Sequence, residues 1–367
     1  MLSAFIALLI LGWLVIVHEL GHFVVARWAG VRILRFSVGF GPRLFSWTRG
    51  HTEYAVSAIP LGGYVKMAGE QYAPPAEAGR ASQPGEPWEY LSKPIGVRAA
   101  IVFAGPFVNY LVALLSLWAV FIIGYPELLP VVGKVEEATP AHAAGLKKGD
   151  RIVSIDGRPV DTWEQMAKTI LASPSRPLTF EVKRESTTET VSVVPAPMQV
   201  PDLFNRSKTI GRIGAWSSGE ARLRRVGPVV ALKEAIRQQG AFTAQTMVGL
   251  LLVITGRVSM RDSMTGPIGI IYMTSEAMRS GLPALLTTIS LLSLSLAIFN
   301  LFPIPILDGG HLFFLALEKL RGRPVSLHIQ ERSAQVSFVL LVTLVLVSCI
   351  NDVNRFGLVE KLFGWAR

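Results

Sequence analysis

Two histidines and a glutamate interrupt an apolar run at "VIVHELGHFVV", residues 15–25. On a helix, the spacing of His18 and His22 places both imidazoles on one face, where they can bind one metal ion. Zinc suits histidine ligands, and a catalytic zinc site keeps an open position for water. Zinc lowers the pKa of that water towards ~7, so a nearby carboxylate can take its proton. The motif therefore predicts hydrolytic zinc chemistry, in which Glu19 activates a zinc-bound water.

Such a site needs a third protein ligand. Asp308 is the leading candidate, because it ends a long uncharged run and a carboxylate there requires a cation as partner. Pro303 and Pro305 break the helix just before it, and Gly309 allows close backbone approach. His311 remains a rival ligand. His328 is a further candidate, whereas His51 in a strand-rich loop and His142 in a soluble domain are expected to have no role in the site.

The composition indicates a membrane protein. Of 367 residues, 50% are hydrophobic and only 17% are charged, and the mean hydropathy is +0.43. Uncharged stretches long enough to cross a bilayer, which takes about 20 residues, are 2–26, 99–123, 282–307 and 333–351. The first has no Lys or Arg before Arg27 and no cleavage site, so we expect it to be retained. A fifth stretch, 238–256, has the short apolar core "MVGLLLVI" and fits an interfacial or packed helix better.

Charge and cysteine content exclude other classes. The net charge is +10, but no basic helix is interleaved with aromatic residues, so nucleic acid is not expected as a partner. The single cysteine, Cys349, excludes an internal disulfide and a cysteine-based metal cluster.

Lys and Arg concentrate in the 27–98 loop and at 319–323, which predicts that both loops are cytoplasmic. His18 and His22 then lie in the cytoplasmic half of the first span. They lie roughly 7–14 Å along the helix from Arg27, and the third span brings Asp308 to the same depth. If 238–256 also crossed the membrane, Asp308 would emerge on the opposite face. We therefore expect four spans.

The soluble parts differ in character. Residues 27–70 are rich in β-branched and aromatic residues with Gly and Pro turns, which predicts strands near the membrane edge. Residues 71–98 are typical of a linker. Within 127–197, "TPAHAAGLKKGDRIVSIDGRPV" resembles the PDZ pattern of bacterial proteases, a domain that binds extended peptides by strand addition.

Five segments together resemble the bacterial site-2 proteases, of the regulator-of-sigma-E-protease type: "HELGH" at 18–22, "GFGP" at 39–42, "IPLGGYVKMAGE" at 59–70, "AGPFVNY" at 104–110 and "FNLFPIPILDGGH" at 299–311. The resemblance implies an intramembrane zinc metalloprotease in the bacterial inner membrane, with its active site near the cytoplasmic face. His18, His22 and Asp308 would bind Zn²⁺ and Glu19 would be the catalytic base. Asn300 and the Pro303 region would help to hold the substrate as a strand against the 30–67 β element.

The implied fold is a multi-pass α-helical membrane protein with four transmembrane helices, a membrane-associated β element and an extracytoplasmic α/β PDZ domain. The implied partners are the lipid bilayer, single-span substrates such as anti-sigma factors or remnant signal peptides, and a first-cut protease acting upstream. The expected segments are 1–26 (first span), 27–70 (reentrant β region), 71–98 (linker), 99–123 (second span), 127–197 (PDZ), 198–281 (a strand and amphipathic helices), 282–318 (third span) and 333–351 (fourth span).

Two other functions use the same residues: a membrane zinc transporter or sensor, and a non-catalytic PDZ scaffold with a structural metal. Transport favours several weak sites along a path, and structural zinc usually has four protein ligands. Asn109, a second polar residue at depth, fits helix packing or substrate contact equally well.

Overall fold

The computed structural model describes residues 2–70, 86–201, 207–258 and 266–355. The chain forms two compact units, one of residues Met1–Val120 and Pro228–Arg367 and the other of Phe121–Gly227. Most of the linker expected at 71–98 lies outside the described residues. Its last residues already belong to the second helix, which begins at Ile95.

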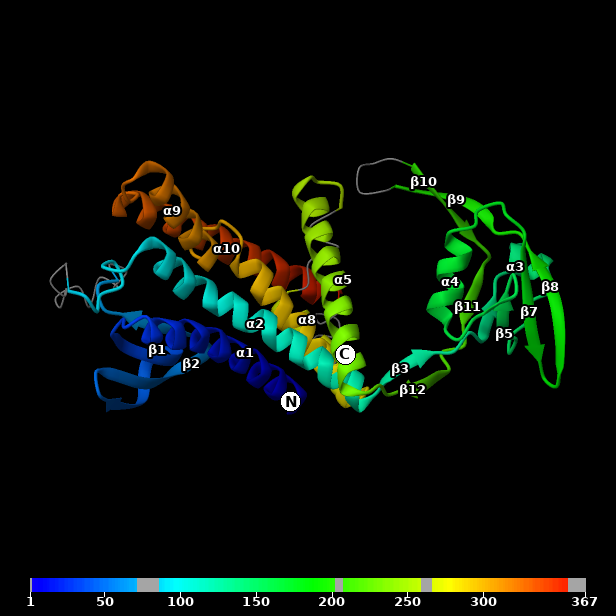
Figure 1. The fold of residues 1–367 in the computed structure, drawn as a ribbon, viewed down its shortest axis with the longest axis horizontal. Helices are drawn as coiled ribbons and strands as arrows, with labels where there is room; N and C mark the ends of the chain where they lie inside the picture. Colours follow the sequence, from blue (N-terminus) through cyan, green and yellow to red (C-terminus); the bar gives the residue numbers. More distant parts are fainter. Residues whose placement is uncertain (1, 71–85, 202–206, 259–265, 356–367) are drawn as a thin grey trace, which may run out of the picture. The chain divides into compact units, whose positions relative to one another are not determined.

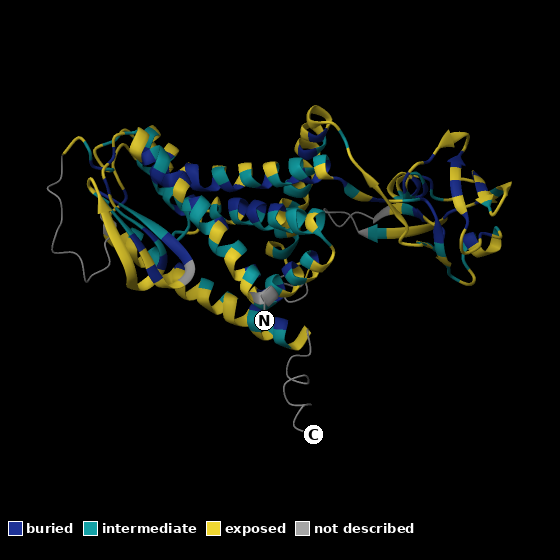
Figure 2. Cartoon of the chain, turned by 90° about the horizontal axis from the view of Figure 1, so that it is seen from below, coloured by how far each residue is buried: buried dark blue, intermediate teal, exposed yellow. Residues whose placement is uncertain are grey.

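Four of the described helices are long and apolar enough to cross a membrane. They lie in α1 (Leu2–Trp28), α2 (Ile95–Ile123), α8 (Leu282–Asn300) and α10 (Leu327–Arg355). α1, α2 and α8 run obliquely side by side (Figure 1). Much of the helical surface is exposed (Figure 2), and on α10 it carries apolar side chains such as Phe338 and Leu340. An exposed apolar surface of this kind suits contact with lipid.

The helix α5 (Pro228–Ile254) joins two segments of the sequence analysis. It contains an amphipathic part and most of the uncharged stretch 238–256, which we did not expect to cross the membrane. It is not among the four candidate spans. Its Phe242 and Leu250 pack against Leu294 and Ile298 of α8, and its Gln239 donates to the backbone carbonyl of Tyr110. A further helix, α7 (Pro267–Arg279), begins where the Asp352 carboxylate accepts the N–H groups of Gly266 and Gly269. α5 therefore packs on the bundle as an additional helix.

The third predicted segment, 282–318, is two helices and not one. α8 ends at Asn300 and α9 begins at Asp308 and ends at Arg321. Pro303 and Pro305 lie in the connection, where proline lacks an N–H and disfavours a helix before it. Asp308 therefore occupies the first turn of α9, where the helix dipole favours a carboxylate.

The predicted strands at 30–67 form β1 (Ile33–Arg49) and β2 (Thr52–Met67), two long antiparallel strands that fold back on each other. Residues 35–38 pair on one side with 63–66 and on the other with 53–56, while 43–49 pair with 52–57. The stretch 35–38 therefore lies between 63–66 and 53–56, residues 43–49 pair with the far side of 52–57, and residues 63–67 form one edge. Within the described residues this edge has no neighbouring strand.

The second unit contains a four-stranded sheet in the order β6–β5–β7–β8: Arg158–Pro159, Arg151–Ile155, Leu178–Arg184 and Thr187–Val193. Its core includes Phe180 and Ile152, packed with Met166 of helix α4 (Trp163–Leu171). The remaining elements are short: α3 (Pro140–Ala143), β3 (Tyr125–Leu128), β4 (Val132–Val135), β9 (Ala196–Pro201), β10 (Ser207–Arg212), β11 (Ala215–Ser217) and β12 (Ala221–Arg224).

This unit is larger than the segment 127–197 expected from the PDZ-like pattern. β12 pairs with β3 and β11 pairs with β4, so strands after residue 197 close on the strands that open the unit. These pairings join residues about ninety positions apart, which periodicity along the chain does not reveal. They also bring the two ends of the unit together, since the N–H of Val226 donates to the carbonyl of Phe121.

Candidate metal centre and active site

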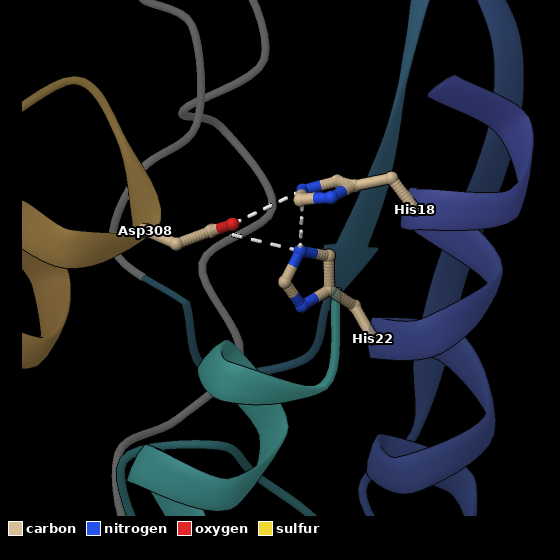
Figure 3. Close-up of side chains that lie close together, drawn as sticks. All are labelled: His18, His22 and Asp308. Atoms are coloured by element: carbon tan, nitrogen blue, oxygen red, sulfur yellow. Dashed lines mark hydrogen bonds and ion pairs between the residues drawn. The ribbon is translucent and has the colours of Figure 1, made fainter. Parts of the chain in front are cut away.

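His18, His22 and Asp308 meet at one point, although 286 positions separate His22 from Asp308. His18 Nε2 lies 3.0 Å from Asp308 Oδ2 and 3.2 Å from His22 Nε2, and His22 Nε2 lies 3.5 Å from Asp308 Oδ1. Figure 3 shows the three side chains pointing toward a common centre from α1 and from the start of α9. Both histidines are buried. Among the described residues this is the one group of side chains arranged to hold a metal.

The donor set and its spacing fit zinc. Ligand atoms at roughly 2.0–2.1 Å from a tetrahedral zinc ion lie about 3.3–3.4 Å apart. The three observed separations, 3.0, 3.2 and 3.5 Å, bracket that value. Two imidazoles and one carboxylate also leave a fourth position open, as catalytic zinc sites do. The structure brings Asp308 into this group and leaves His311 outside it.

Close packing of α1 on α2 makes room for the two imidazoles. A Cβ atom at Gly21 would lie 2.6 Å from the carbonyl oxygen of Ala104, and one at Gly105 would lie 2.8 Å from His18 Cε1. Real Cβ contacts essentially never fall below 3.0 Å. The "HELGH" and "AGP" segments therefore need glycine at these two positions for the helices to approach this closely.

The opposite nitrogens of the two rings have different neighbours. His22 Nδ1 lies 2.8 Å from the backbone carbonyl oxygen of Ile101, which accepts its proton and leaves Nε2 free. His18 Nδ1 lies 3.4 Å from Nδ2 of Asn109. Such outer hydrogen bonds set the tautomer and ring orientation of histidine ligands. Asn109 stood out in the sequence as a polar residue at depth, but nothing along the chain linked it to His18.

A cavity of about 770 Å³ adjoins the three side chains. Its lining includes Glu19, Asn300 and His311 together with residues of the strand edge 63–67. Glu19 accepts a hydrogen bond from the backbone N–H of Val65. Asn300 therefore shares a cavity with the metal-binding group. Pro303 instead lines a separate apolar groove between α2, α5 and α8.

Further charged groups surround the cavity. Glu70 Oε2 accepts the backbone N–H of Met67 at 3.1 Å, and burial raises the pKa of Glu70. Arg98, at the start of α2, donates to both oxygens of Glu318 on α9, with Nη1 3.1 Å from Oε2. Burial also raises the pKa of Tyr90, which lines the same cavity. None of these groups was a predicted site residue. They are charged or phenolic side chains in loops and at helix ends, where such residues are ordinary.

The remaining histidines lie elsewhere. His51 is exposed in the turn between β1 and β2, His142 is in α3 of the second unit, and His328 is exposed near the start of α10.

Comparison with known proteins agrees with this arrangement. A sequence model of the family described as "Peptidase family M50" matches residues 6–344. The chain belongs to peptidase family M50. A protein of Rhizobium meliloti named as a zinc metalloprotease is 37% identical over 356 residues, which are 95% of each chain. The "Regulator of sigma-E protease RseP" of Salmonella typhimurium is 31% identical over 451 aligned positions, covering 96% of this chain and 98% of that protein.

These relatives show that the chain is a zinc metalloprotease with Zn²⁺ as its cofactor, as the motif predicted. Among solved structures, the PDZ domain of an SdrC-like protein from Listeria monocytogenes is 18% identical. That match covers 27% of this chain and 88% of the domain, with a TM-score of 0.18. A likeness at this level carries no argument about the fold.

Proposed function

We propose that this chain is an intramembrane protease that hydrolyses peptide bonds within the transmembrane segments of single-span membrane proteins. The observation that carries the proposal is the position of the metal-binding group. Its two histidines and the adjacent Glu19 lie inside an apolar helix long enough to span a bilayer. Ionisable groups are costly at that depth and are retained there for function. A protease whose site lies in the membrane is suited to peptide bonds that lie in the membrane too.

The chemistry follows from the residues at the cavity. His18, His22 and Asp308 would hold zinc, which polarises a water molecule and lowers its pKa towards ~7. Glu19 follows His18 directly in the chain and lines the same cavity, so it is placed to take the proton of the attacking water. It would then deliver a proton to the leaving amide nitrogen, as a general base that becomes a general acid.

A transmembrane helix hides its peptide groups in its own hydrogen bonds, so it must unwind before it is cut. The edge at 63–67, beside which the described part of the chain has no further strand, offers replacement partners near Glu19, because an extended segment can add to a sheet edge through main-chain bonds. In the structure two N–H groups of this edge, of Val65 and Met67, are bonded to the carboxylates of Glu19 and Glu70. An added substrate strand would take over these N–H groups.

Asn300 lines the cavity beside the metal-binding group and is placed to contact such a strand. Pro303 follows in the same connection but borders the apolar groove, so its proposed contribution is to hold the connection in a non-helical form.

The relative named as a regulator of sigma-E protease suggests the biological setting. We place the chain in the bacterial inner membrane, with its active site near the cytoplasmic face and the PDZ-like unit on the other side. Its substrates would be anti-sigma factors or remnant signal peptides, released to it by a first-cut protease. The PDZ-like unit would control access to the site and perform no chemistry, since it holds no metal-binding group among its described residues.

Replacing the proposed base gives the direct test. Glu19→Gln should leave zinc content unchanged and abolish cleavage of a tagged single-span substrate by the purified chain in detergent. Glu276→Gln, at an exposed acidic position on α7, is the matched control and should cleave at the wild-type rate. Cleavage by a pure Glu19→Gln preparation would refute the role of Glu19. Uptake of zinc into proteoliposomes that disappears in His18→Ala would favour a transporter instead.

A further inference from the structure

Asn109 is a buried amide whose side chain serves no other described contact between helices. The residue is 0% exposed in the middle of α2. Its Nδ2 lies 3.4 Å from His18 Nδ1, while its Oδ1 has no hydrogen-bond partner. Leaving a buried polar atom without a hydrogen-bond partner is destabilising, so such an atom requires an explanation.

Helix packing does not provide that explanation. Around Asn109, the backbone carbonyls of α2 accept hydrogen bonds from three polar side chains of α5 and α8. Ser293 donates to the carbonyl of Asn109 at 2.7 Å, Ser290 to that of Ala113, and Gln239 to that of Tyr110. None of these bonds uses the Asn109 amide. The side chain is therefore directed at His18 alone.

The amide suits a histidine that binds a metal through Nε2. His18 Nε2 points at the Asp308 carboxylate, 3.0 Å away, and Nδ1 points at the Asn109 side chain. When His18 binds a metal, Nε2 must offer its lone pair and the ring proton sits on Nδ1. That N–H then needs an acceptor. Rotation of the Asn109 side chain about its last torsion, which has two broad minima, would bring Oδ1 into this place.

The two histidines are not equivalent in this respect. His22 has a fixed acceptor, the carbonyl of Ile101, 2.8 Å from its Nδ1. A main-chain carbonyl can only accept, so it holds His22 in one tautomer. His18 has no described backbone acceptor at Nδ1, and an asparagine can donate in one orientation and accept in the other.

We propose that Asn109 is a positioning residue of the metal site, whose side-chain oxygen accepts the Nδ1–H of His18 and holds this histidine in the tautomer that binds zinc through Nε2. The proposal rests on the assignment of His18 as a zinc ligand made under the proposed function. Loss of comparable outer hydrogen bonds typically weakens metal binding by about 10–100-fold.

The test measures zinc affinity of the purified full-length chain by competition with a chromophoric chelator. Asn109→Leu, which keeps the volume and removes both polar atoms, should lower the affinity about 10–100-fold. Asn109→Asp, which keeps an acceptor, should stay within a few-fold of wild type. Ser293→Ala is the matched control, because it removes a buried hydrogen bond at the same contact without touching His18, and it should leave the affinity unchanged.

A spectroscopic readout separates positioning from general damage. With Co²⁺ in place of zinc, Asn109→Leu should alter the visible absorption bands of the ligand field, while Ser293→Ala and Asn109→Asp should retain them. Should the leucine variant fail to fold, Asn109→Ala takes its place in both measurements.

Wild-type zinc affinity and Co²⁺ bands in Asn109→Leu would overturn the proposal, as would equal losses in the leucine and aspartate variants. His18→Ala distinguishes this failure from failure of the metal site itself. If His18→Ala loses zinc while Asn109→Leu does not, only the role of Asn109 is wrong. If His18→Ala also keeps zinc, the ligand assignment is wrong.

Discussion

Gly105 is the position where the smallest change to the chain should most disturb the metal site. A Cβ atom there would come closest to His22 Nε2, and it would lie 2.6 Å from His22 Cε1 and 2.8 Å from His18 Cε1, whereas ordinary contacts begin at 3.4 Å. Gly105→Ala therefore requires the His18 ring to move by about 0.6 Å and the His22 ring by more than about 0.8 Å, or α2 to withdraw from α1 by a similar distance. Metal–ligand distances tolerate only about ±0.2 Å. The added methyl group should thus break the geometry of the site.

We expect Gly105→Ala to reduce zinc affinity at least about tenfold and the cleavage rate about 100-fold, because misplacement of catalytic groups by about 1 Å costs roughly that factor. The assays are zinc content after dialysis against a chelator and turnover of a tagged single-span substrate. Helix propensity alone points the other way, since Ala favours a helix interior by about 0.8–1.0 kcal/mol over Gly.

Gly249→Ala is the matched control, because a Cβ atom at this position in α5 meets nothing within 4 Å. It should leave zinc content and cleavage at wild-type levels. Wild-type zinc affinity and turnover in Gly105→Ala would show that the helices can separate freely, and would refute the argument from close approach.

Two further predictions concern ion pairs. Burial alone raises the pKa of Asp150, but two hydrogen bonds from Arg184 at 2.8 Å and one from the N–H of Lys147 lower it overall. Since the folded pKa lies below the unfolded value of about 3.9, the second unit should be fully stabilised above pH ~4 and lose this stability as the pH falls through the folded pKa. Proteolysis by an acid-active protease should follow that profile, and Arg184→Leu should make the unit susceptible at higher pH. Arg98→Leu or Glu318→Leu alone should each destabilise the first unit by about 3–5 kcal/mol, because each leaves one buried charge unpaired. The double variant should cost less than either alone in thermal unfolding, and additive losses would contradict the pairing.

Local patterns were enough to predict the candidate spanning helices and to place two of the three proposed metal ligands on one helix face. Apolar composition over about twenty residues indicates a membrane helix whatever the rest of the chain does, and the structure has four such candidates. The i, i+4 spacing of His18 and His22 places them on one helix face by geometry alone. Pro303 and Pro305 likewise indicate a helix break, although the predicted segment 282–318 joins two helices that the structure separates.

Other features were hidden because they arise between distant parts of the chain. The double pairing of residues 35–38 with two stretches of β2, and the pairing of β3 with β12, depend on the path of the backbone and leave no periodic signal. The bond between Arg98 and Glu318 joins residues 220 positions apart. In the sequence, each of these two residues resembles an ordinary surface charge. Only their contact in the structure identifies them as an ion pair.

The sequence alone therefore predicts the chemistry: the proposed ligand types, a glutamate beside them, and their place in an apolar helix. The fold brings Asp308 and not His311 into the group, since both lie within one turn of α9 and packing against α1 selects which side chain reaches the histidines. The fold also places Asn109 beside His18. The helices α1 and α2 approach each other at Gly21 and Gly105, close enough for a side chain on α2 to contact a proposed ligand on α1. Ligand identity follows from residue type and spacing, whereas ligand orientation depends on contacts across helices.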